Sequence, residues 1–476
     1  MGHSLPAPEP ARRELGLIGL GVMGRNFLLN VAGRGFPVAG YDQDPGQVAA
    51  LVRAAAGLDV AGADRLADLV ASLRPPRAVM LLVPAGAPVD AVSAGLAPLL
   101  EPGDLIIDGG NSHYPDTDRR ARELAEAGIR FLGLGVSGGE EGARRGPSLM
   151  PGGDRAGYER IRPLLEAAAA RVDGDPCVAY LGPGSAGHFV KMVHNGIEYA
   201  LMELIAECYD LMKRGLGLDN RAIRQAFLDW SEQGPGGFLL EITARIFGRL
   251  EPGTGRALVD AVLPVARQKG TGSWTSRCAL ELQVPVPTID LAVAQRDLSA
   301  LERDQASRLL PRPAPPRDRA WPEPAGLEQA LHAGMLLAFA QGLALLQTAS
   351  DRFGYGLDLA EVARIWRGGC IIRTPLLEPI RQACRRRPGL ANLLLDPDLA
   401  ARVSSREPGL RAAVCAGARA GLPVPGLMSA LAYLDGYRSA WLPANLIQAQ
   451  RDCFGAHGFE RVDQPGRFHD TWEEQP

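Results

Sequence analysis

Lysine is nearly absent from this chain of 476 residues. Of the 51 basic residues only three are lysines, namely Lys191, Lys213 and Lys269. Arginine supplies positive charge almost anywhere but keeps its proton near neutral pH, whereas a lysine in a suitable environment loses it. Lys213 stands near a predicted helix end, where a positive charge is favourable. Lys191 lies within a cluster of other polar residues, which makes it a candidate base.

The chain also lacks an excess of charge, a long apolar run and paired cysteines. Its net charge of -3 gives no electrostatic case for a nucleic acid or an anionic membrane as partner. The most apolar stretch, residues 335–346, is interrupted by Gln341 and predicts a buried helix rather than a membrane span. The seven cysteines form no CxxC pair and no metal-ligand spacing, which predicts no metal site and a reducing, cytoplasmic location.

A glycine-rich turn follows the first apolar segment, residues 14–20, which predicts a strand. The turn consists of Gly19, Leu20, Gly21, Val22, Met23 and Gly24. It leads into a predicted helix that ends at residue 31. Such glycines let the backbone approach a pyrophosphate, and the helix N-terminus stabilises its charge. The next predicted strand, residues 36–41, ends at Asp42, close to the spacing expected of an acid that binds the adenosine ribose.

Three more predicted strands, residues 78–83, 104–108 and 130–136, continue this pattern. Gly109, Gly110 and Asn111 follow the second of them, and the third ends at the Ser-Gly-Gly sequence of residues 137–139. Open parallel sheets bind ligands at strand ends of this kind. One glycine pair alone is most simply a turn, but their succession favours a site.

Beyond residue 185 the pattern changes to long helices, with no strand expected. On the helix predicted for residues 187–213, Lys191, His194, Asn195 and Glu198 share one face, and Tyr199 lies at its margin. The opposite side is apolar and predicts a core stripe. From this helix alone, a solvated face and the wall of an active site are equally good interpretations. The glycine-rich strand ends favour the interpretation as the wall of an active site.

Four other segments complete the chain. Residues 1–13 have no secretory-signal core and predict a disordered tail. Residues 270–272 predict a flexible loop able to wrap an anion. The proline-rich residues 311–324 predict a surface loop, and helical periodicity resumes over residues 327–353.

Long sequence motifs connect these segments to a known family. They are GLGVMGRN, DGGNS, VSGGEEGARRGPSLMPGG, GHFVKMVHNGIEY, QKGTGSWT, IWRGGCIIR and NLIQAQRDCFGAHGFER. With them, nearly all of the chain from residue 14 resembles the long-chain 6-phosphogluconate dehydrogenases, the oxidative decarboxylases of the pentose phosphate pathway. The resemblance implies a Rossmann-type domain over residues 14–185 and a large all-helical substrate and dimerisation domain over residues 186–444. It also implies a tail, residues 445–476, that reaches the partner subunit of a homodimer.

The resemblance further implies roles for individual residues. It implies that Lys191 is the catalytic lysine, that Glu198 is the proton donor and that Asn195 assists them. The implied cofactor site adds to the glycine turn the residues Asp42, Gln43, Asp44, Val83, Pro84, Ala85 and Asn111. The residues implied to hold the sugar acid are Asn111, Ser137, Gly138, Gly139, His194 and Asn195. Those implied for its phosphate are Tyr199, Lys269, Thr271 and Arg296, with Arg451 and His457 donated by the partner. From the sequence alone, a surface ion pair with Asp297 or Glu302 is the simpler interpretation of Arg296.

Several positions depart from the family pattern. Pro84 and Ser273 stand where lysines are usual, and Arg145 and Cys453 replace tyrosines. Residues 42–44 read Asp-Gln-Asp, whereas NADP-using members carry Asn-Arg-Thr or Asn-Arg-Ser, whose arginine meets the 2′-phosphate. An acid at position 42 therefore predicts a preference for NAD over NADP. Asp44 has a second explanation, because Asp before Pro45 is a typical N-cap.

Two other functions fit parts of the sequence. A simple β-hydroxyacid dehydrogenase would share the glycine turn and the Ser-Gly-Gly sequence but would not decarboxylate; the cluster of phosphate-binding cations argues against it. A nucleotide-sensing or scaffolding protein would have kept the fold and lost catalysis; the retained Lys191, Asn195 and Glu198 argue against that.

Overall fold

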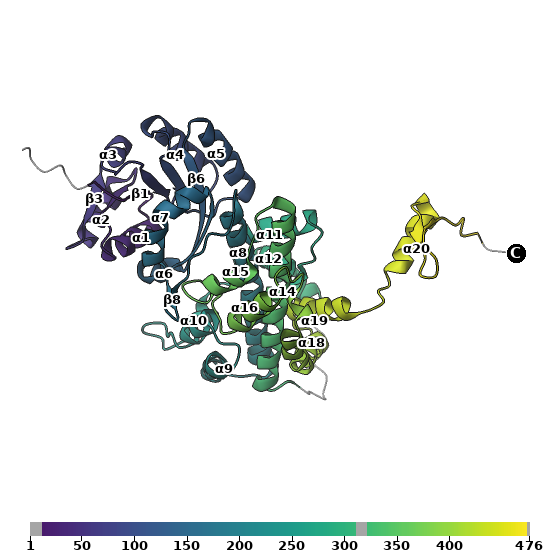
Figure 1. Ribbon diagram of the computed structural model, residues 1–476. Helices are drawn as coiled ribbons and strands as arrows, with labels where there is room; N and C mark the ends of the chain where they lie inside the picture. Colours follow the sequence, from purple (N-terminus) through teal and green to yellow (C-terminus); the bar gives the residue numbers. More distant parts are fainter. Residues whose placement is uncertain (1–11, 311–320, 474–476) are drawn as a thin grey trace, which may run out of the picture. The chain divides into compact units, whose positions relative to one another are not determined.

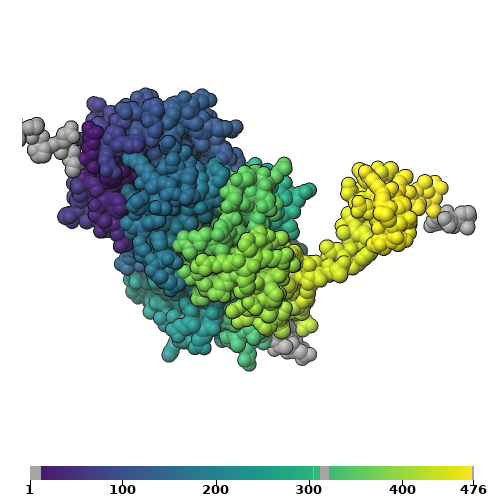
Figure 2. Space-filling view, viewed as in Figure 1, coloured from purple at the N-terminus to yellow at the C-terminus, as the bar shows by residue number. Residues whose placement is uncertain are grey.

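The computed structural model describes residues 12–310 and 321–473. Most of the predicted disordered tail and most of the predicted proline-rich loop therefore lie outside the described residues. Contacts divide the chain into two compact units, Met1–Ala430 and Leu431–Pro476. The first unit contains a sheet domain followed by a helical domain, which pack directly against each other (Figure 2).

The sheet domain is a seven-stranded, doubly wound sheet with the strand order β3-β2-β1-β4-β5-β6-β7. Its strands are β1 (Leu15–Ile18), β2 (Val38–Tyr41), β3 (Val60–Ala63), β4 (Ala78–Leu81), β5 (Leu105–Asp108), β6 (Arg130–Ser137) and β7 (Ser148–Gly153). Neighbours run parallel except β6 and β7. The five predicted strands are confirmed.

The sequence did not predict β3 and β7. The β7 sequence SLMPGG contains a proline and two glycines, which normally indicate a loop. It is a strand because it pairs with β6 along six residues at the edge of the sheet, where proline is tolerated. Long-range pairing therefore overrides local propensity here.

Helices cover both faces of the sheet (Figure 1). They are α1 (Val22–Gly33), α2 (Pro45–Ala54), α3 (Leu66–Ala71), α4 (Ala87–Leu96), α5 (Tyr114–Glu126), α6 (Gly139–Arg145) and α7 (Arg155–Ala168). Apolar residues of α1, α2 and α7 form one core cluster with the sheet, and those of α3, α4 and α5 form a second one. The remaining elements of this domain are η1 (Ala97–Leu99), β8 (Arg171–Val172) and β9 (Asp175–Pro176).

The helical domain is built around α8 (Ala186–Asp210), which continues as a π-turn over Leu211–Gly215, in agreement with the predicted helix. The other helices are α9 (Asn220–Gln233), α10 (Phe238–Phe247), α11 (Thr271–Glu281), α12 (Pro287–Ser299), α13 (Asp304–Leu309), α14 (Pro324–Phe353), α15 (Leu359–Trp366), α16 (Leu377–Arg386), α17 (Pro397–Ser404) and α18 (Glu407–Ala420). A further helix, α19 (Pro425–Arg438), begins in the first unit and ends in the second. Short 3-10 turns lie at Leu258–Ala261 and Leu393–Leu395.

Helix α14 is long and apolar enough to cross a membrane, but 94% of its most apolar 18 residues are buried inside the fold. It packs along α8 and α18. The buried helix that the sequence predicted around residues 335–346 is therefore a core helix of this domain.

Glycines allow α8 to cross the sheet closely. Gly187 lies against the backbone of β6 and β7, so close to the carbonyl oxygens of Gly133 and Met150 that a side chain there would overlap them. A Cβ atom at Gly135 would come within 2.5 Å of the Lys191 Cβ. This close approach brings the polar residues of α8 to the carboxyl end of β6.

The second unit folds around one buried carboxylate. It contains α20 (Ala444–Gly455) and an antiparallel pair, β10 (Phe459–Glu460) and β11 (Arg467–Phe468). Asp452 accepts hydrogen bonds from Gly458 N (2.7 Å), His469 Nδ1 (2.9 Å) and Trp472 Nε1 (2.9 Å). Burial favours its neutral form, but the hydrogen bonds prevail and lower the pKa of Asp452. The expectation of no strand beyond residue 185 was wrong, because two-residue strands show no periodicity.

Candidate active site

The polar face of α8 is buried, which excludes the solvated-face interpretation. Lys191 is 6% exposed, and all residues from Ala186 to Ile197 are buried. Burial lowers the pKa of Lys191, and the nearby Glu198 carboxylate and Cys370 thiol oppose this shift. Lys191 therefore loses its proton more readily than an exposed lysine does, as a general base requires.

His194 connects α8 to the Ser-Gly-Gly turn at the end of β6. Its Nε2 atom lies 3.2 Å from Ser137 Oγ, and its Nδ1 atom lies 3.1 Å from Asn195 Oδ1. Burial lowers the pKa of His194 well below its usual range, and Lys191 lowers it further. A neutral, fully buried imidazole with both nitrogens engaged orients the Ser137 hydroxyl and the Asn195 amide rather than transferring protons.

Glu198 lies two turns beyond Lys191 on the same face. Its carboxyl oxygen lies 3.8 Å from His194 Nδ1. Burial raises the pKa of Glu198, and Lys191 and Arg296 oppose this. The site thus combines an amine that favours its neutral form with a carboxyl that favours its protonated form.

A segment of the helical domain covers the Ser-Gly-Gly turn. Gly138 has φ +139°, and a Cβ atom there would lie 2.5 Å from the Gly369 carbonyl oxygen. The backbone N–H of Ile371 lies 3.4 Å from Ser137 Oγ. Cys370 is fully buried, with Sγ 3.0 Å from the Trp366 carbonyl oxygen. These residues belong to the motif IWRGGCIIR, but sequence reasoning gave them no role in the site.

The predicted phosphate residues are partly assembled. The Arg296 guanidinium lies 3.4 Å from the centre of the Tyr199 ring and donates to the Arg267 carbonyl oxygen (3.4 Å). An ion pair of Arg296 with Asp297 or Glu302 is not observed among the described residues. Thr271 is buried beside them, whereas Lys269 is exposed.

The loop predicted at residues 270–272 is instead the start of a helix. Gly270 takes φ +99° as the N-cap, and α11 begins at Thr271. The Gly272 position is close enough to the Tyr199 ring that only a glycine fits, with a Cβ-to-Cε2 distance of 2.6 Å. Packing of α11 on α8 thus orders a segment that its two glycines marked as flexible.

The glycine-rich turn leaves an open cradle at the N-terminus of α1. Gly19 has φ +95° and approaches the Leu82 carbonyl, where a Cβ atom would lie at 2.5 Å. A Cβ atom at Gly21, by contrast, would meet nothing within 4 Å, and no side chain caps this helix end. The N-terminus of α1 is therefore uncapped and open at Gly21, as a site for a dinucleotide pyrophosphate requires.

Asp42 lies at the carboxyl end of β2, beside this cradle. One carboxylate oxygen accepts from Leu20 N (2.7 Å) and the other from Asp44 N (3.0 Å). Asp44 accepts from Gly46 N (2.8 Å) and is the N-cap of α2, as its sequence context indicated. Gln43 is exposed, as are Pro84 and Ala85, whereas Val83 is half-buried.

Asn111 is exposed beyond β5, and a buried arginine that the sequence did not single out supports this loop. Arg120 donates to the Gly86 carbonyl (3.1 Å) and the Asp90 carboxylate (2.7 Å), and lies 3.5 Å from Asp108. It joins the loops after β4 and β5. Arginine on an amphipathic helix carries no signal that distinguishes such a residue from a surface one.

Four other residues that the sequence singled out have local contacts of their own. Arg451 and His457 are exposed residues of the second compact unit, where Arg451 donates to Gln448 Oε1 (3.0 Å). Arg145 is exposed and pairs with Glu141 at 3.4 Å. Ser273 donates to the Gly270 carbonyl oxygen at 2.8 Å.

Comparisons with known proteins agree along nearly the whole chain. Residues 14–182 match the model of the NAD binding domain of 6-phosphogluconate dehydrogenase, and residues 187–472 match its C-terminal domain. The chain is 47% identical over 466 residues to the NADP(+)-dependent, decarboxylating 6-phosphogluconate dehydrogenase of Bacillus subtilis, covering 97% of this chain and 99% of that one. It is also 47% identical over 452 residues to decarboxylating 6-phosphogluconate dehydrogenase 1 of Saccharomyces cerevisiae, covering 94% and 92% of the two chains.

A solved structure gives the same result. Plasmodium falciparum 6-phosphogluconate dehydrogenase superposes with a TM-score of 0.93 and 39% identity, covering 96% of this chain and 100% of that one. Family models, sequence relatives and fold coincide, and this chain belongs to the 6-phosphogluconate dehydrogenase family.

Proposed function

We propose that this chain oxidises and decarboxylates 6-phospho-D-gluconate, giving ribulose 5-phosphate and carbon dioxide, with a nicotinamide cofactor as hydride acceptor. One observation carries the proposal: Lys191 and Glu198 share a buried helix face and have pKa values shifted towards the neutral forms of both groups. In such a pair the neutral amine can remove a proton from one site of the substrate, and the protonated carboxyl can donate a proton to another site.

The residues of the cradle fit a dinucleotide. The N–H groups at the start of α1 hold the pyrophosphate, and Asp42 accepts hydrogen bonds from the adenosine ribose. The loops with Val83 and Asn111 border the same edge of the sheet. When bound, the nicotinamide accepts a hydride from carbon 3 of the substrate.

Lys191 and Glu198 act in sequence on the substrate. Neutral Lys191 removes the proton of the 3-hydroxyl as the hydride leaves. The resulting 3-keto acid is a β-keto acid, and the Lys191 ammonium polarises its carbonyl oxygen while carbon dioxide departs. Glu198 then protonates carbon 1 of the enol. Asn195, oriented by His194, donates its amide N–H groups to the carboxylate end of the substrate, which lies beside Ser137.

The phosphate end of the substrate meets Arg296, Tyr199, Thr271 and Lys269. Arg296 is already positioned by its stacking on Tyr199. Lys269 is exposed and bonds to no described residue, so it is available to an anion. A phosphate is bound most strongly by such charge-assisted hydrogen bonds.

The deciding experiment measures reduced-cofactor absorbance and released carbon dioxide with 6-phosphogluconate. Equal amounts of both products are expected. Oxidation without carbon dioxide would favour the non-decarboxylating β-hydroxyacid dehydrogenase. The absence of both products with NAD and with NADP would favour a protein that has kept the fold and lost catalysis.

We infer, as a finer point, that NAD is the preferred cofactor. The Asp42 carboxylate would face the 2′-phosphate of NADP, and residues 42–44 include no arginine to neutralise it. The Bacillus subtilis relative is NADP(+)-dependent by name, so this preference would set the chain apart from that relative. Catalytic efficiency with each cofactor at saturating substrate tests it; a value with NADP equal to that with NAD would contradict it.

We further propose a homodimer in which Arg451 and His457 complete the partner's phosphate site. Leu263, Val265 and Leu298 are exposed apolar residues on the rim of the Arg296 cavity. The second unit carries exposed Leu446, Ile447 and Phe454 on α20. Two apolar surfaces of this kind are buried when a second copy exchanges its tail. Sedimentation at micromolar concentration is expected to give a dimer; a monomer would refute it.

A cytoplasmic location is the corresponding proposal for the cell. All seven cysteines are free thiols, as a reducing compartment maintains them. Cell fractionation followed by immunodetection tests this, and recovery in a secreted or membrane fraction would contradict it.

A further inference from the structure

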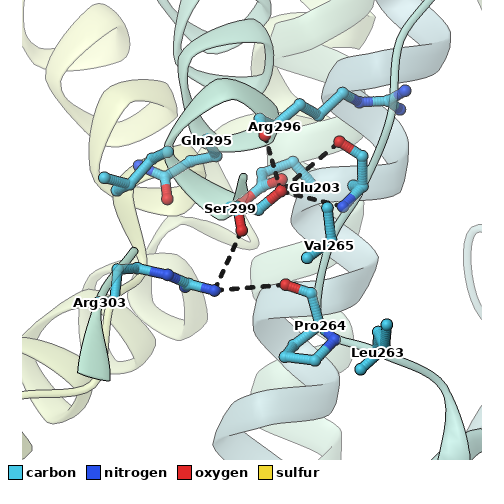
Figure 3. Close-up of a pocket in the computed structure, with 10 residues that line it drawn as sticks. Glu203, Leu263, Pro264, Val265, Gln295, Arg296, Ser299 and Arg303 are labelled. Carbon is cyan, nitrogen blue, oxygen red and sulfur yellow. Dashed lines mark hydrogen bonds between the residues drawn. The ribbon is translucent and has the colours of Figure 1, made fainter. Parts of the chain in front are cut away.

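Glu203 is a half-buried carboxyl beside the proposed phosphate site that no role described above uses. It lies on α8, one turn beyond Tyr199, and lines a cavity of about 350 Å³ together with Arg296, Ser299 and Arg303 (Figure 3). Its carboxyl has no hydrogen bond and no ion pair with any residue that the structure describes. A half-buried acid without a partner beside two arginines is available to a ligand or to a moving guanidinium.

Ser299 and Arg303 already have hydrogen-bond partners in the cavity wall. Ser299 Oγ donates to the Arg296 carbonyl oxygen (2.7 Å) and accepts from Ala266 N (2.9 Å). Arg303 donates to the carbonyl oxygens of Pro264 (3.4 Å) and Ser299 (3.1 Å). Ser299 and Arg303 are thus engaged with backbone groups, whereas the Glu203 carboxyl bonds to no described residue.

The charges around Glu203 define how it titrates. Arg296 on α12 and Arg303 beyond α12 face the same cavity, and Glu198 and Glu207 are its neighbours on α8. Glu207 accepts from Gly426 N (2.6 Å) and Leu427 N (2.8 Å). Burial raises the pKa of Glu207 to about 8, the two N–H groups oppose this, and the charge of Glu203 adds to it. Burial raises the pKa of Glu203 to about 7, and Arg296 alone opposes this.

We propose that Glu203 is a positioning residue that makes the affinity of the phosphate site depend on pH. When ionised, its carboxylate attracts the Arg296 guanidinium and repels the substrate phosphate; when protonated, it leaves Arg296 to the phosphate. This inference rests on the proposed function, in which Arg296 binds that phosphate. Glu203 touches no reacting atom, so the turnover number at saturating substrate is unaffected.

The direction of the effect follows from linkage. A bound anion stabilises the protonated form of Glu203, so it raises the pKa of this carboxyl. The affinity for the substrate phosphate is therefore highest at pH values below the pKa of Glu203 in the unliganded protein, and it falls as pH rises through about 7. Because one pKa unit of coupling equals a tenfold change in affinity, we expect KM for 6-phosphogluconate to rise about tenfold between about pH 6 and about pH 8.5.

The experiment compares the dimeric wild-type enzyme with Glu203→Gln, Glu203→Asp and a control, Asp210→Asn. Asp210 lies on the same helix and pairs with Arg214, outside the cavity. KM and kcat are measured across the pH range. Since the substrate phosphate itself titrates, the inhibition constant of sulfate, which stays a dianion, is measured in parallel.

In Glu203→Gln the rises of KM and of the sulfate constant with pH are expected to be about tenfold smaller than in the wild type, because the other charged groups of the site are the same in both proteins. The kcat is expected to be unchanged, and Glu203→Asp and Asp210→Asn are expected to keep the wild-type rise. A Gln variant whose constants rise in parallel with the wild type would overturn the proposal. So would a wild type whose constants do not change with pH. In both cases normal turnover would leave the proposed function intact, whereas no turnover at any pH would reject the function itself.

Discussion

Asp42→Asn is expected to move cofactor selectivity towards NADP. The Asp42 carboxylate is held at the end of β2 by Leu20 N at 2.7 Å and Asp44 N at 3.0 Å, so it cannot easily turn away from a nucleotide. A 2′-phosphate charge about 5 Å away costs about 3 kcal/mol at an effective dielectric constant near 20. Asp42 is half-exposed, so solvent reduces this cost by about half.

The expected change in the NADP-to-NAD ratio of kcat/KM is therefore about tenfold to a hundredfold. Asparagine retains one acceptor oxygen for the two backbone donors, so a loss of about 1–2 kcal/mol in stability is expected alongside. Initial rates at saturating 6-phosphogluconate give the ratio, and thermal unfolding gives the stability.

Asp44→Asn is the matched control. It removes an equal charge nearby, but asparagine caps a helix as well as aspartate does, so the Gly46 N–H keeps its acceptor. The ratio should change little. An unchanged ratio in Asp42→Asn, or the same change in both variants, would refute Asp42 as the selectivity residue.

Three further predictions concern the proposed chemistry and the tail. Activity should fall as pH falls through the lowered pKa of Lys191 and as pH rises through the raised pKa of Glu198. Glu198→Gln should lower kcat about a hundredfold and abolish the fall in activity at high pH; a variant that keeps this fall would show that Glu198 is not the proton donor. Gly135→Ala should lower kcat and reduce the free energy of unfolding by about 1–3 kcal/mol, measured by thermal unfolding, because its Cβ would lie 2.5 Å from the Lys191 Cβ. Gly33→Ala, whose Cβ would meet nothing within 4 Å, should change neither quantity, and equal effects of the two substitutions would disprove the packing argument. Truncation before Asn445 should raise KM for 6-phosphogluconate sharply, and an unchanged KM in a soluble dimer would remove the tail from the site.

The sequence by itself determined the features that depend on short-range pattern. The turn over residues 19–24 requires glycine where φ is positive or where backbones touch, so it is visible without a structure. The helix carrying Lys191 and Glu198 follows from its periodicity, and the Asp44 cap follows from the proline after it. These are interactions within a few residues of chain.

Only the tertiary structure decided whether the polar face of α8 is solvated or enclosed. The answer depends on β6, β7 and α14, which lie far from α8 in sequence and bury it from several sides. The contact of Gly369 with the Gly138 turn and the position of Arg120 between two loops likewise depend on long-range packing.

Glu203 is the clearest case of a property that only the tertiary structure decides. Its neighbours on α8 predict an ordinary helix residue, and its unpaired carboxyl arises only because α12 and the loop of residues 263–266 close a cavity around it. Burial and long-range contact set protonation, and neither is encoded in local periodicity.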